Sequence, residues 1–394
     1  MTEIKNQTRI AYYSINDPLD KRSWSGATYY LGQSIKRNIG DIHFLGPVKI
    51  PWILDKTFRA IQKLSRFFFK TEWIPKYSLI KNIYAAGILK KKMKGHHYDF
   101  LLAPAAAPEL GYLNTDIPIV YFGDATYKIY SETYKKEFKD LNSFSRWEGE
   151  HLEKRALKKS SLIIFTSRWA ALSAINDYGV HPDKIEVIQM GANIDSVPDK
   201  NTIFNKEKNK TLTLLFLSVD WDRKGGSIAF DTLKELYKTN KDISLIVCGC
   251  IPPPEYIHPC MQVIPFLNKN ETKDFEKFIQ ILSSSHFLLL PTRADCTPVV
   301  NCESGAYGIP VITTNVGGVS DAVKDGINGY CLPLKANGAD YASLITKIFS
   351  DKEKYHALIE SSRKRFDDEL NWDKFAENLQ KALQKHKVLP VIKQ

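Results

Sequence analysis

Short apolar runs alternate with helical patterns through the first half of the chain. A first run over 9–13 precedes a helical pattern over 26–37, and further helical stretches separate the later runs. Those later runs are short and continuously apolar, as in buried strands, and lie at 100–103, 119–122 and 162–165. Because parallel strands need crossover helices that cover the faces of their sheet, the alternation predicts an α/β sheet with helices on both sides.

The same alternation resumes after a polar interruption. Residues 196–210 lack any period and predict a linker. The chain then ends in a charged helical stretch from about residue 351. The apolar runs of the second half lie at 212–219, 244–249, 287–291 and 310–314. We therefore predict two doubly wound, Rossmann-like α/β domains, 1–197 and 198–374, with ligands at the carboxyl ends of the strands and in a cleft between the halves.

The net charge of +11 is unevenly distributed. Between Lys56 and His97 there are eleven lysines and arginines against one acid, Glu72, and aromatic residues are interspersed. Positions 57, 61, 64 and 68 follow helical spacing, so this basic segment (56–97) favours contact with a membrane surface or an anionic acceptor. An ordinary surface helix with a solvated basic face is the alternative. No recognised nucleic-acid motif accompanies the charge, so we expect no nucleic acid as partner.

Composition and cysteine placement indicate the class of protein. Hydrophobic residues make up 43% of 394, enough for two cores, and the polar start and lack of a run of about 18 apolar residues predict neither a signal peptide nor a membrane span. All six cysteines lie in the second half without a CxxC pair, which predicts buried free thiols rather than a metal site or disulfides. We expect a cytoplasmic protein, peripheral on the inner face of the membrane if the basic segment binds lipid.

Two acids lie in a strand–loop–helix pattern over 291–330. Asp295 follows the apolar run at 287–290, and a helix is expected to begin near Thr297 and Pro298, which suit a cap and a first turn. Glu303 follows eight residues after Asp295, about two turns into this helix. On spacing alone, a turn aspartate and a surface glutamate remain the alternative.

The expected helix start lies between these two acids. Its first N–H groups, those of Val299, Val300 and Asn301, would form an anion site. Carboxylates on either side can accept hydrogen bonds from sugar or ribose hydroxyls. An acid, an anion site and a second acid together suit a nucleotide sugar.

Two cations follow the apolar run at 212–219. Arg223 and Lys224 precede a pair of glycines at a strand-to-helix turn, where they suit a diphosphate. Asp220 and Asp222 form an Asp-x-Asp pair, which can instead hold a divalent metal on a diphosphate. In the first half, Gly26 lies at a strand-to-helix loop where backbone N–H groups could close on a phosphate, although an ordinary glycine turn is equally consistent.

These pieces together resemble glycosyltransferase family 4, a retaining group with the GT-B architecture. The resemblance runs through most of the chain and is strongest between residues 153 and 372. The combination is specific, whereas any one piece is not. The stretches that carry it are 159–195, 222–226, 298–319, 321–333 and 370–379.

The resemblance implies roles for the candidate residues of the second half. Glu303 matches the second acid of the family's E-x7-E motif, which binds the donor ribose. Asp295 matches the first acid, which holds the transferred sugar, but it is one methylene shorter than the usual glutamate. Lys224 matches the diphosphate lysine, and Arg223 replaces the family's usual arginine. Phe266 lies in the loop that contacts the base.

Two candidates of the first half follow from the same resemblance. Gly26 matches the glycine that lies against the phosphate. Asp124 stands where many members place a histidine near the reacting sugar. An aspartate can accept a hydrogen bond from a sugar hydroxyl. A helix cap for a helix beginning near Ala125 is the alternative.

The implied reaction is retaining transfer without a protein nucleophile, a metal or a cofactor other than the nucleotide-sugar donor. The donor would be UDP- or GDP-linked, and the acceptor a glycan, a lipid-linked glycan or a small molecule, as in cell-surface polysaccharide or glycolipid synthesis. The helix at 375–394 is expected to pack back on the first domain. A sugar-nucleotide epimerase and a catalytically degenerate nucleotide-sugar-binding subunit are the rival interpretations.

Overall fold

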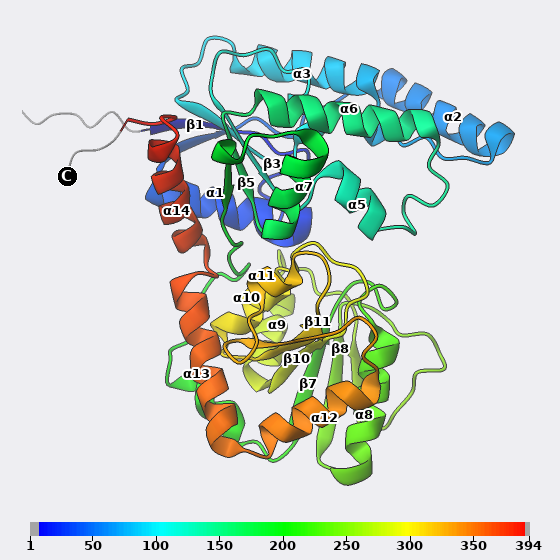
Figure 1. Ribbon diagram of the computed structural model, residues 1–394, viewed down its shortest axis with the longest axis vertical. Helices are drawn as coiled ribbons and strands as arrows, with labels where there is room; N and C mark the ends of the chain where they lie inside the picture. The colour runs from blue at the N-terminus through cyan, green and yellow to red at the C-terminus, as the bar shows by residue number, and fades with distance from the viewer. Residues whose placement is uncertain (1–7, 391–394) are drawn as a thin grey trace, which may run out of the picture. The chain divides into compact units, whose positions relative to one another are not determined.

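The computed structural model describes residues 8–390, which form two compact units (Figure 1). The first unit runs to Ser23 and includes Leu31–Ile188 and the chain from Ala376 onward. The second unit consists of Gln189–Phe375 together with Trp24–Tyr30. The sequence predicted domains at 1–197, joined by the helix at 375–394, and at 198–374. The second unit differs in beginning at Gln189 and in including seven residues from near the start of the chain.

A parallel sheet of six strands forms the centre of the first unit, in the order β2-β1-β3-β4-β5-β6. Its strands are β1 (Thr8–Tyr12), β2 (Gly40–Phe44), β3 (Phe100–Pro104), β4 (Ile119–Gly123), β5 (Leu162–Phe165) and β6 (Ile185–Val187). The three central strands, β3 to β5, are buried along their whole length, which explains their continuous apolar sequences. The order reverses between β1 and β3, so this unit is doubly wound, as predicted.

Helices cover both faces of this first sheet (Figure 1). One face packs against residues of α3, α4, α6 and α7, including Leu89, Leu110, Leu157 and Ala174. On the other face, Gly32 of α1 faces the rings of Tyr12 and Phe44. The helices are α1 (Ala27–Asn38), α2 (Trp52–Phe69), α3 (Leu79–Met93), α4 (Ala107–Leu110), α5 (Tyr127–Thr133), α6 (Ser143–Lys159) and α7 (Arg168–Tyr178), with 3₁₀ turns η1 (Ser23–Gly26), η2 (Pro75–Tyr77) and η3 (Pro182–Lys184).

The second unit contains another parallel sheet of six strands, in the order β12-β11-β10-β7-β8-β9. Here the order reverses between β7 and β10, and the loops that follow these two strands therefore diverge from the same point of the sheet. The strands are β7 (Leu212–Leu217), β8 (Ile243–Cys248), β9 (Met261–Ile264), β10 (Phe287–Leu290), β11 (Val311–Thr314) and β12 (Gly329–Leu332). Both sequence-predicted sheets are thus confirmed.

Helices again lie on both faces of the second sheet, with α8 and α12 packed together on one of them (Figure 1). The helices are α8 (Gly226–Thr239), α9 (Thr272–Ser284), α10 (Val300–Ala306), α11 (Val319–Ala322), α12 (Gly338–Phe349), α13 (Lys352–Asp368) and α14 (Trp372–Lys385), preceded by the 3₁₀ helix η4 (Thr202–Lys208). From Ala376 onward, α14 belongs to the first unit, where Glu186 of β6 accepts hydrogen bonds from Lys385 at 2.7 Å and His386 at 2.9 Å.

The interpretation of 196–210 as a polar linker is wrong. Within it η4 packs on α13, and the side chains of Ile203 and Lys206 are buried. Glu207 and His356 are hydrogen bonded at 2.9 Å, and Lys206 donates to the carbonyl oxygen of Tyr307 at 2.6 Å. The polar composition concealed this packing because buried lysines are rare and have no periodic signature.

The cysteines are free thiols, as predicted, but three of the six are only half-buried. Burial raises the pKa of Cys248 and Cys250 to about 11 and that of Cys302 and Cys331 to about 12. Between residues 8 and 390, no helix has the length and apolar character needed to cross a bilayer.

Candidate functional site

Two loops of the second unit approach each other at the reversal point between β7 and β10. Gly225, which follows β7, has a φ of 76°. A Cβ at this position would lie 2.0 Å from the carbonyl oxygen of Pro291, which follows β10. Only glycine therefore allows this conformation and this approach together. The contact brings the Arg223–Lys224 pair next to the loop that carries Asp295.

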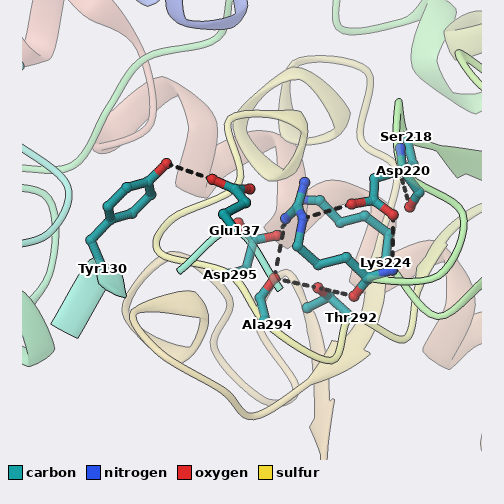
Figure 2. Close-up of polar contacts among 9 residues, drawn as sticks. Tyr130, Glu137, Ser218, Asp220, Lys224, Thr292, Ala294 and Asp295 are labelled. Carbon is teal, nitrogen blue, oxygen red and sulfur yellow. Dashed lines mark hydrogen bonds and ion pairs between the residues drawn. The ribbon is translucent and has the colours of Figure 1, made fainter. Parts of the chain in front are cut away.

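Lys224 and Asp295 form an ion pair at this point, and the two side chains point toward one another (Figure 2). Their side chains are only 12% and 7% exposed. The backbone of Asp295 is held from the other side by Gly317, since a Cβ at Gly317 would lie 1.9 Å from the Asp295 carbonyl oxygen. A buried, fixed pair of this kind is a preorganised charge arrangement rather than a surface salt bridge.

Arg223 joins the two loops. Its backbone N–H and its Nε donate to the Asp220 carboxylate at 3.0 and 3.1 Å, and its Nη1 donates to the Ala294 carbonyl oxygen at 3.2 Å. The Arg223 carbonyl oxygen in turn accepts from the N–H of Arg293 at 2.8 Å. Arg223 thus has a structural role that the sequence did not reveal, and Asp220 of the Asp-x-Asp pair is its partner.

Within the described range, the structure holds no group of three or more His, Cys, Asp and Glu residues arranged to bind a metal ion. The Asp-x-Asp alternative therefore gains no support from clustering of ligands.

Glu303 is buried in the first turn of α10 with 1% of its side chain exposed. Its Oε1 lies 2.5 Å from the ammonium nitrogen of Lys269, which also lies 4.1 Å from the centre of the Phe278 ring. The interpretations of Glu303 as a helix-surface residue and of Asp295 as a simple turn residue are therefore wrong. Sequence reasoning missed Lys269, although it chose Phe266 from the same loop after β9, and Phe266 itself is 55% exposed.

The start of α10 differs from the prediction. The helix begins at Val300 and has seven residues, so Thr297 and Pro298 belong to the preceding loop, and no side chain caps the helix. Asn301 donates its N–H to the Pro298 carbonyl oxygen at 3.2 Å and is not available to an anion. Thr297 and Pro298 are buried, and Val299 and Val300 are half-buried. Of the three N–H groups expected to form an anion site, that of Asn301 is therefore hydrogen bonded within the chain. Glu303 lies in the first turn of the helix, not two turns from its start.

The family model for glycosyl transferases group 1 matches residues 199–365, and that for Glycosyltransferase Family 4 matches residues 53–196. The chain belongs to glycosyltransferase family 4. The two matches together span most of both units and confirm the resemblance found in the sequence.

Individual relatives are distant in sequence. Spore coat protein SA of Bacillus subtilis (strain 168) is 32% identical over 125 residues, covering 29% of this chain and 33% of that protein. Alpha-maltose-1-phosphate synthase of Mycolicibacterium smegmatis is 21% identical over 272 residues, covering 60% of this chain and 69% of that protein. The chain thus matches about a third of the length of the first relative.

Solved structures share the whole fold. A glycosyltransferase from Rickettsia africae ESF-5 has a TM-score of 0.65 at 16% identity, covering 97% of this chain and 99% of its own. Sucrose-phosphate synthase from Thermosynechococcus elongatus has a TM-score of 0.67 at 15% identity, with coverage of 96% and 99%. Anabaena Alr3699/HepE in complex with UDP has a TM-score of 0.64 at 14% identity, with coverage of 96% and 100%. These likenesses agree with the GT-B architecture.

Two candidates of this family-4 chain come from its first half. Asp124 follows β4 in the first unit and is half-buried, and its charge contributes to raising the pKa of the buried Tyr121, after burial itself. The helix-cap alternative for Asp124 is wrong, because α5 begins at Tyr127 after Thr126. Gly26 lies in the second unit directly before α1, with a φ of 97°.

Proposed function

We propose that this chain is a retaining glycosyltransferase that moves a sugar from a nucleotide diphosphate sugar to a glycan, a lipid-linked acceptor or a small molecule. The observation that carries the proposal is the buried Lys224–Asp295 pair at the strand-order reversal of the second sheet. Ligands of doubly wound sheets bind at such points. A cation suited to a diphosphate and a carboxylate suited to sugar hydroxyls lie together there.

In the proposed reaction no side chain of the protein acts as a nucleophile. The acceptor hydroxyl oxygen forms a bond to the anomeric carbon, and the bond from that carbon to the diphosphate oxygen breaks on the same face. The electron pair of the broken bond stays on the diphosphate, which takes the acceptor's proton. Lys224 and Arg223 stabilise the charge that grows on the diphosphate, so the reaction requires no metal ion and no cofactor.

Each remaining candidate has a part in holding the donor. Glu303 accepts hydrogen bonds from the ribose hydroxyls, and Gly26 allows backbone N–H groups to approach the diphosphate. Phe266 contacts the base. The loop of Thr297 and Pro298 and the N–H groups of Val299 and Val300 border the diphosphate. Asp124 accepts a hydrogen bond from a sugar hydroxyl.

We favour a UDP-linked donor over a GDP-linked one. A protein of the same fold, Anabaena Alr3699/HepE, has been solved with UDP and with UDP-glucose. We propose that the acceptor belongs to cell-surface polysaccharide or glycolipid synthesis.

Thermal stabilisation by UDP, GDP and ADP, measured with EDTA present, tests the donor site. We expect one nucleotide to raise the melting temperature, and Lys224→Ala to abolish the rise and lower turnover about 100-fold. Lys234→Ala is the matched control, because Lys234 lies on α8 of the same unit with its side chain 53% exposed. Stabilisation only with a divalent metal would overturn the metal-free reaction. Nucleotide binding without turnover on any acceptor would favour the degenerate subunit, and release of free nucleotide without an acceptor would favour the epimerase.

We also propose that the protein attaches peripherally to an anionic membrane through α2 and α3. Of the 18 residues of α2, only Phe58 and Ser65 are buried. Seven of its large apolar side chains are exposed among basic residues, including Phe67, Phe68 and Phe69 at 79%, 67% and 75% exposed. A soluble surface helix buries its apolar stripe, whereas an interfacial helix keeps aromatic residues exposed beside basic ones. The basic residues of 56–97 complement an anionic lipid surface.

Co-sedimentation with vesicles containing phosphatidylserine tests this attachment. We expect Lys90→Glu with Lys91→Glu to reduce binding about 30-fold or more, since each basic residue near the surface contributes about 1 kcal/mol. Phe68→Ser should separately weaken binding, because it removes an exposed aromatic side chain from the apolar face of α2. Lys92 is unsuitable because it donates to the Leu45 carbonyl oxygen at 2.6 Å. The control is Lys347→Glu with Lys352→Glu, which makes the same charge change at two exposed positions of the second unit and should leave binding unchanged. Equal loss in both pairs would indicate a general charge effect rather than a site on α2 and α3.

A further inference from the structure

Three successive residues before α1 have left-handed backbone conformations. Trp24, Ser25 and Gly26 have φ angles of 47°, 56° and 97°. Glycine adopts such angles readily, but tryptophan and serine do not. Strained conformations of this kind persist only where surrounding groups hold them, and they gather at functional sites.

Asn193 holds this loop within the second unit. Its side chain is fully buried, its Nδ2 donates to the Ser25 carbonyl oxygen at 2.8 Å, and its Oδ1 accepts from Trp372 Nε1 at 2.8 Å. The two contacts require an acceptor at one end of the amide and a donor at the other, so only asparagine in this orientation satisfies both. Tyr30, at the end of the same segment, donates to Asp195 at 3.0 Å.

The backbone of Asn193 also contacts the lysine that pairs with Glu303 in the candidate donor site. Its carbonyl oxygen lies 3.4 Å from the ammonium nitrogen of Lys269, and that lysine pairs with Glu303. The position is fixed in turn by Trp372. A Cβ at Gly191, two residues before Asn193, would lie 2.2 Å from the Trp372 nitrogen and 2.5 Å from its ring. One buried asparagine thus contacts both the strained loop and the Lys269–Glu303 pair.

We propose that Asn193 is a positioning residue for the donor diphosphate. By accepting from Trp372 and donating to Ser25, it fixes the left-handed run of Trp24, Ser25 and Gly26. Successive N–H groups in a turn of this kind can form an anion-binding concavity, and Gly26 is the residue that the family resemblance places against the phosphate. The inference rests on the proposed function, since it assigns the phosphates of the donor to this loop. Asn193 acts through the loop and does not touch the reacting atoms.

Asn193→Asp is the sharpest variant, because it keeps the size of the side chain and replaces the donating NH₂ with an accepting oxygen opposite the Ser25 carbonyl. We expect its affinity for UDP to fall about ten-fold or more, as for loss of one buried hydrogen bond. Its affinity for uridine should stay within twofold of the wild type, because the nucleoside does not reach the loop. Calorimetric titration with uridine, UMP and UDP measures this difference, and a purely structural role would lower all three affinities together.

Ser25→Gly provides the second test. Glycine adopts the left-handed conformation without strain, so in the Asn193→Asp background it should restore part of the UDP affinity, and the two changes should not be additive. If Asn193→Asp does not fold, Trp372→Phe removes the donor to Oδ1 together with part of a buried ring, and it should lower UDP affinity in the same selective way. Equal UDP affinity in wild type and Asn193→Asp, or equal loss for uridine and UDP, would overturn the inference while leaving the proposed function intact. If the wild type binds no nucleoside diphosphate, the proposed function and this inference both fail.

Discussion

The ammonium nitrogen of Lys269 lies 2.5 Å from Oε1 of Glu303, inside the second unit. The acid that resembles the family's ribose-binding residue is thus already paired with a lysine from the loop after β9. If Glu303 binds the donor ribose as proposed, the ribose must either share Glu303 with this lysine or displace it. Lys269 therefore belongs to the site as much as Glu303 does.

Replacing Lys269 should destabilise the second unit, because it leaves Glu303 as a buried acid without its partner. We expect Lys269→Met to lower the unfolding free energy of the second unit by about 3 kcal/mol, as for breaking one partner of a buried pair. Urea denaturation followed by fluorescence measures it, with the exposed Lys273→Met on α9 as control. The double variant Lys269→Met with Glu303→Gln should recover much of the loss. A double variant as unstable as the sum of the two single changes would show that the pair is not the cause.

Asp295 should matter more for turnover than for nucleotide affinity. In Asp295→Asn the carboxylate beside Lys224 is lost, and with it the group assigned to the transferred sugar. We expect turnover to fall about 100-fold while UDP still stabilises the protein, which steady-state kinetics and melting curves check together. Asp231→Asn on α8, where the side chain is 54% exposed, should leave both unchanged. Loss of UDP binding in Asp295→Asn alone would instead place Asp295 in the structure of the phosphate site.

Two buried glutamates should make the first unit less stable as the pH rises. Burial raises the pKa of Glu109 to about 7 and that of Glu153 to about 8. Between about pH 4.5, where both titrate when unfolded, and pH 8, the folded state holds more protons than the unfolded state, so stability falls as pH rises. Glu153→Gln should therefore stabilise the protein at pH 8, by on the order of 4 kcal/mol, and hardly at all at pH 5.

Melting curves between pH 5 and pH 8 measure this difference, with Glu132→Gln as control because Glu132 is exposed on α5 of the same unit. The gain from Glu153→Gln should grow steadily with pH. A constant gain at every pH would mean that the glutamine side chain packs better than the glutamate, rather than that Glu153 titrates.

Lys206 should give the second unit the opposite dependence. Burial lowers the pKa of Lys206 to about 7, so between pH 7 and about pH 10 the folded state holds fewer protons than the unfolded state, and stability rises with pH. We expect Lys206→Met to remove this rise and to be most stabilising near pH 7. Denaturation curves at pH 7 and pH 9 test it against Lys208→Met, an exposed position of the same 3₁₀ helix. A pH slope that persists in Lys206→Met would assign it to another group.

The sequence was sufficient for the two sheets because their strands are buried on both faces and therefore apolar without interruption. It was also sufficient to single out Lys224, Asp295 and Glu303 as candidates, because the loops after β7 and β10 and the start of α10 carry recognisable chemistry. It could not place the start of α10, since Thr297 and Pro298 fit a loop as well as a helix start. Helix boundaries depend on packing that leaves no local pattern.

Other features depended on long-range contacts. Lys269 is a single lysine in a polar loop, and its pairing with Glu303, 34 residues away, has no sequence signal. The left-handed angles of Trp24 and Ser25 contradict local preference and are stabilised by Asn193, 168 residues from Ser25. The burial of Lys206 likewise follows from packing against distant helices. In each of these cases a residue departs from its local conformational or burial preference, and contacts with residues distant in the sequence stabilise it.

The inclusion of Trp24–Tyr30 in the second unit has a practical consequence for anyone dissecting the molecule. A contiguous fragment covering 189–375 would omit the carbonyl that Asn193 bonds and the hydroxyl that Asp195 accepts from. Such a fragment would expose a buried amide and would melt below the intact protein. Adding a synthetic peptide that spans 24–30 should raise its melting temperature again, so this protein lends itself to fragment complementation rather than to domain truncation.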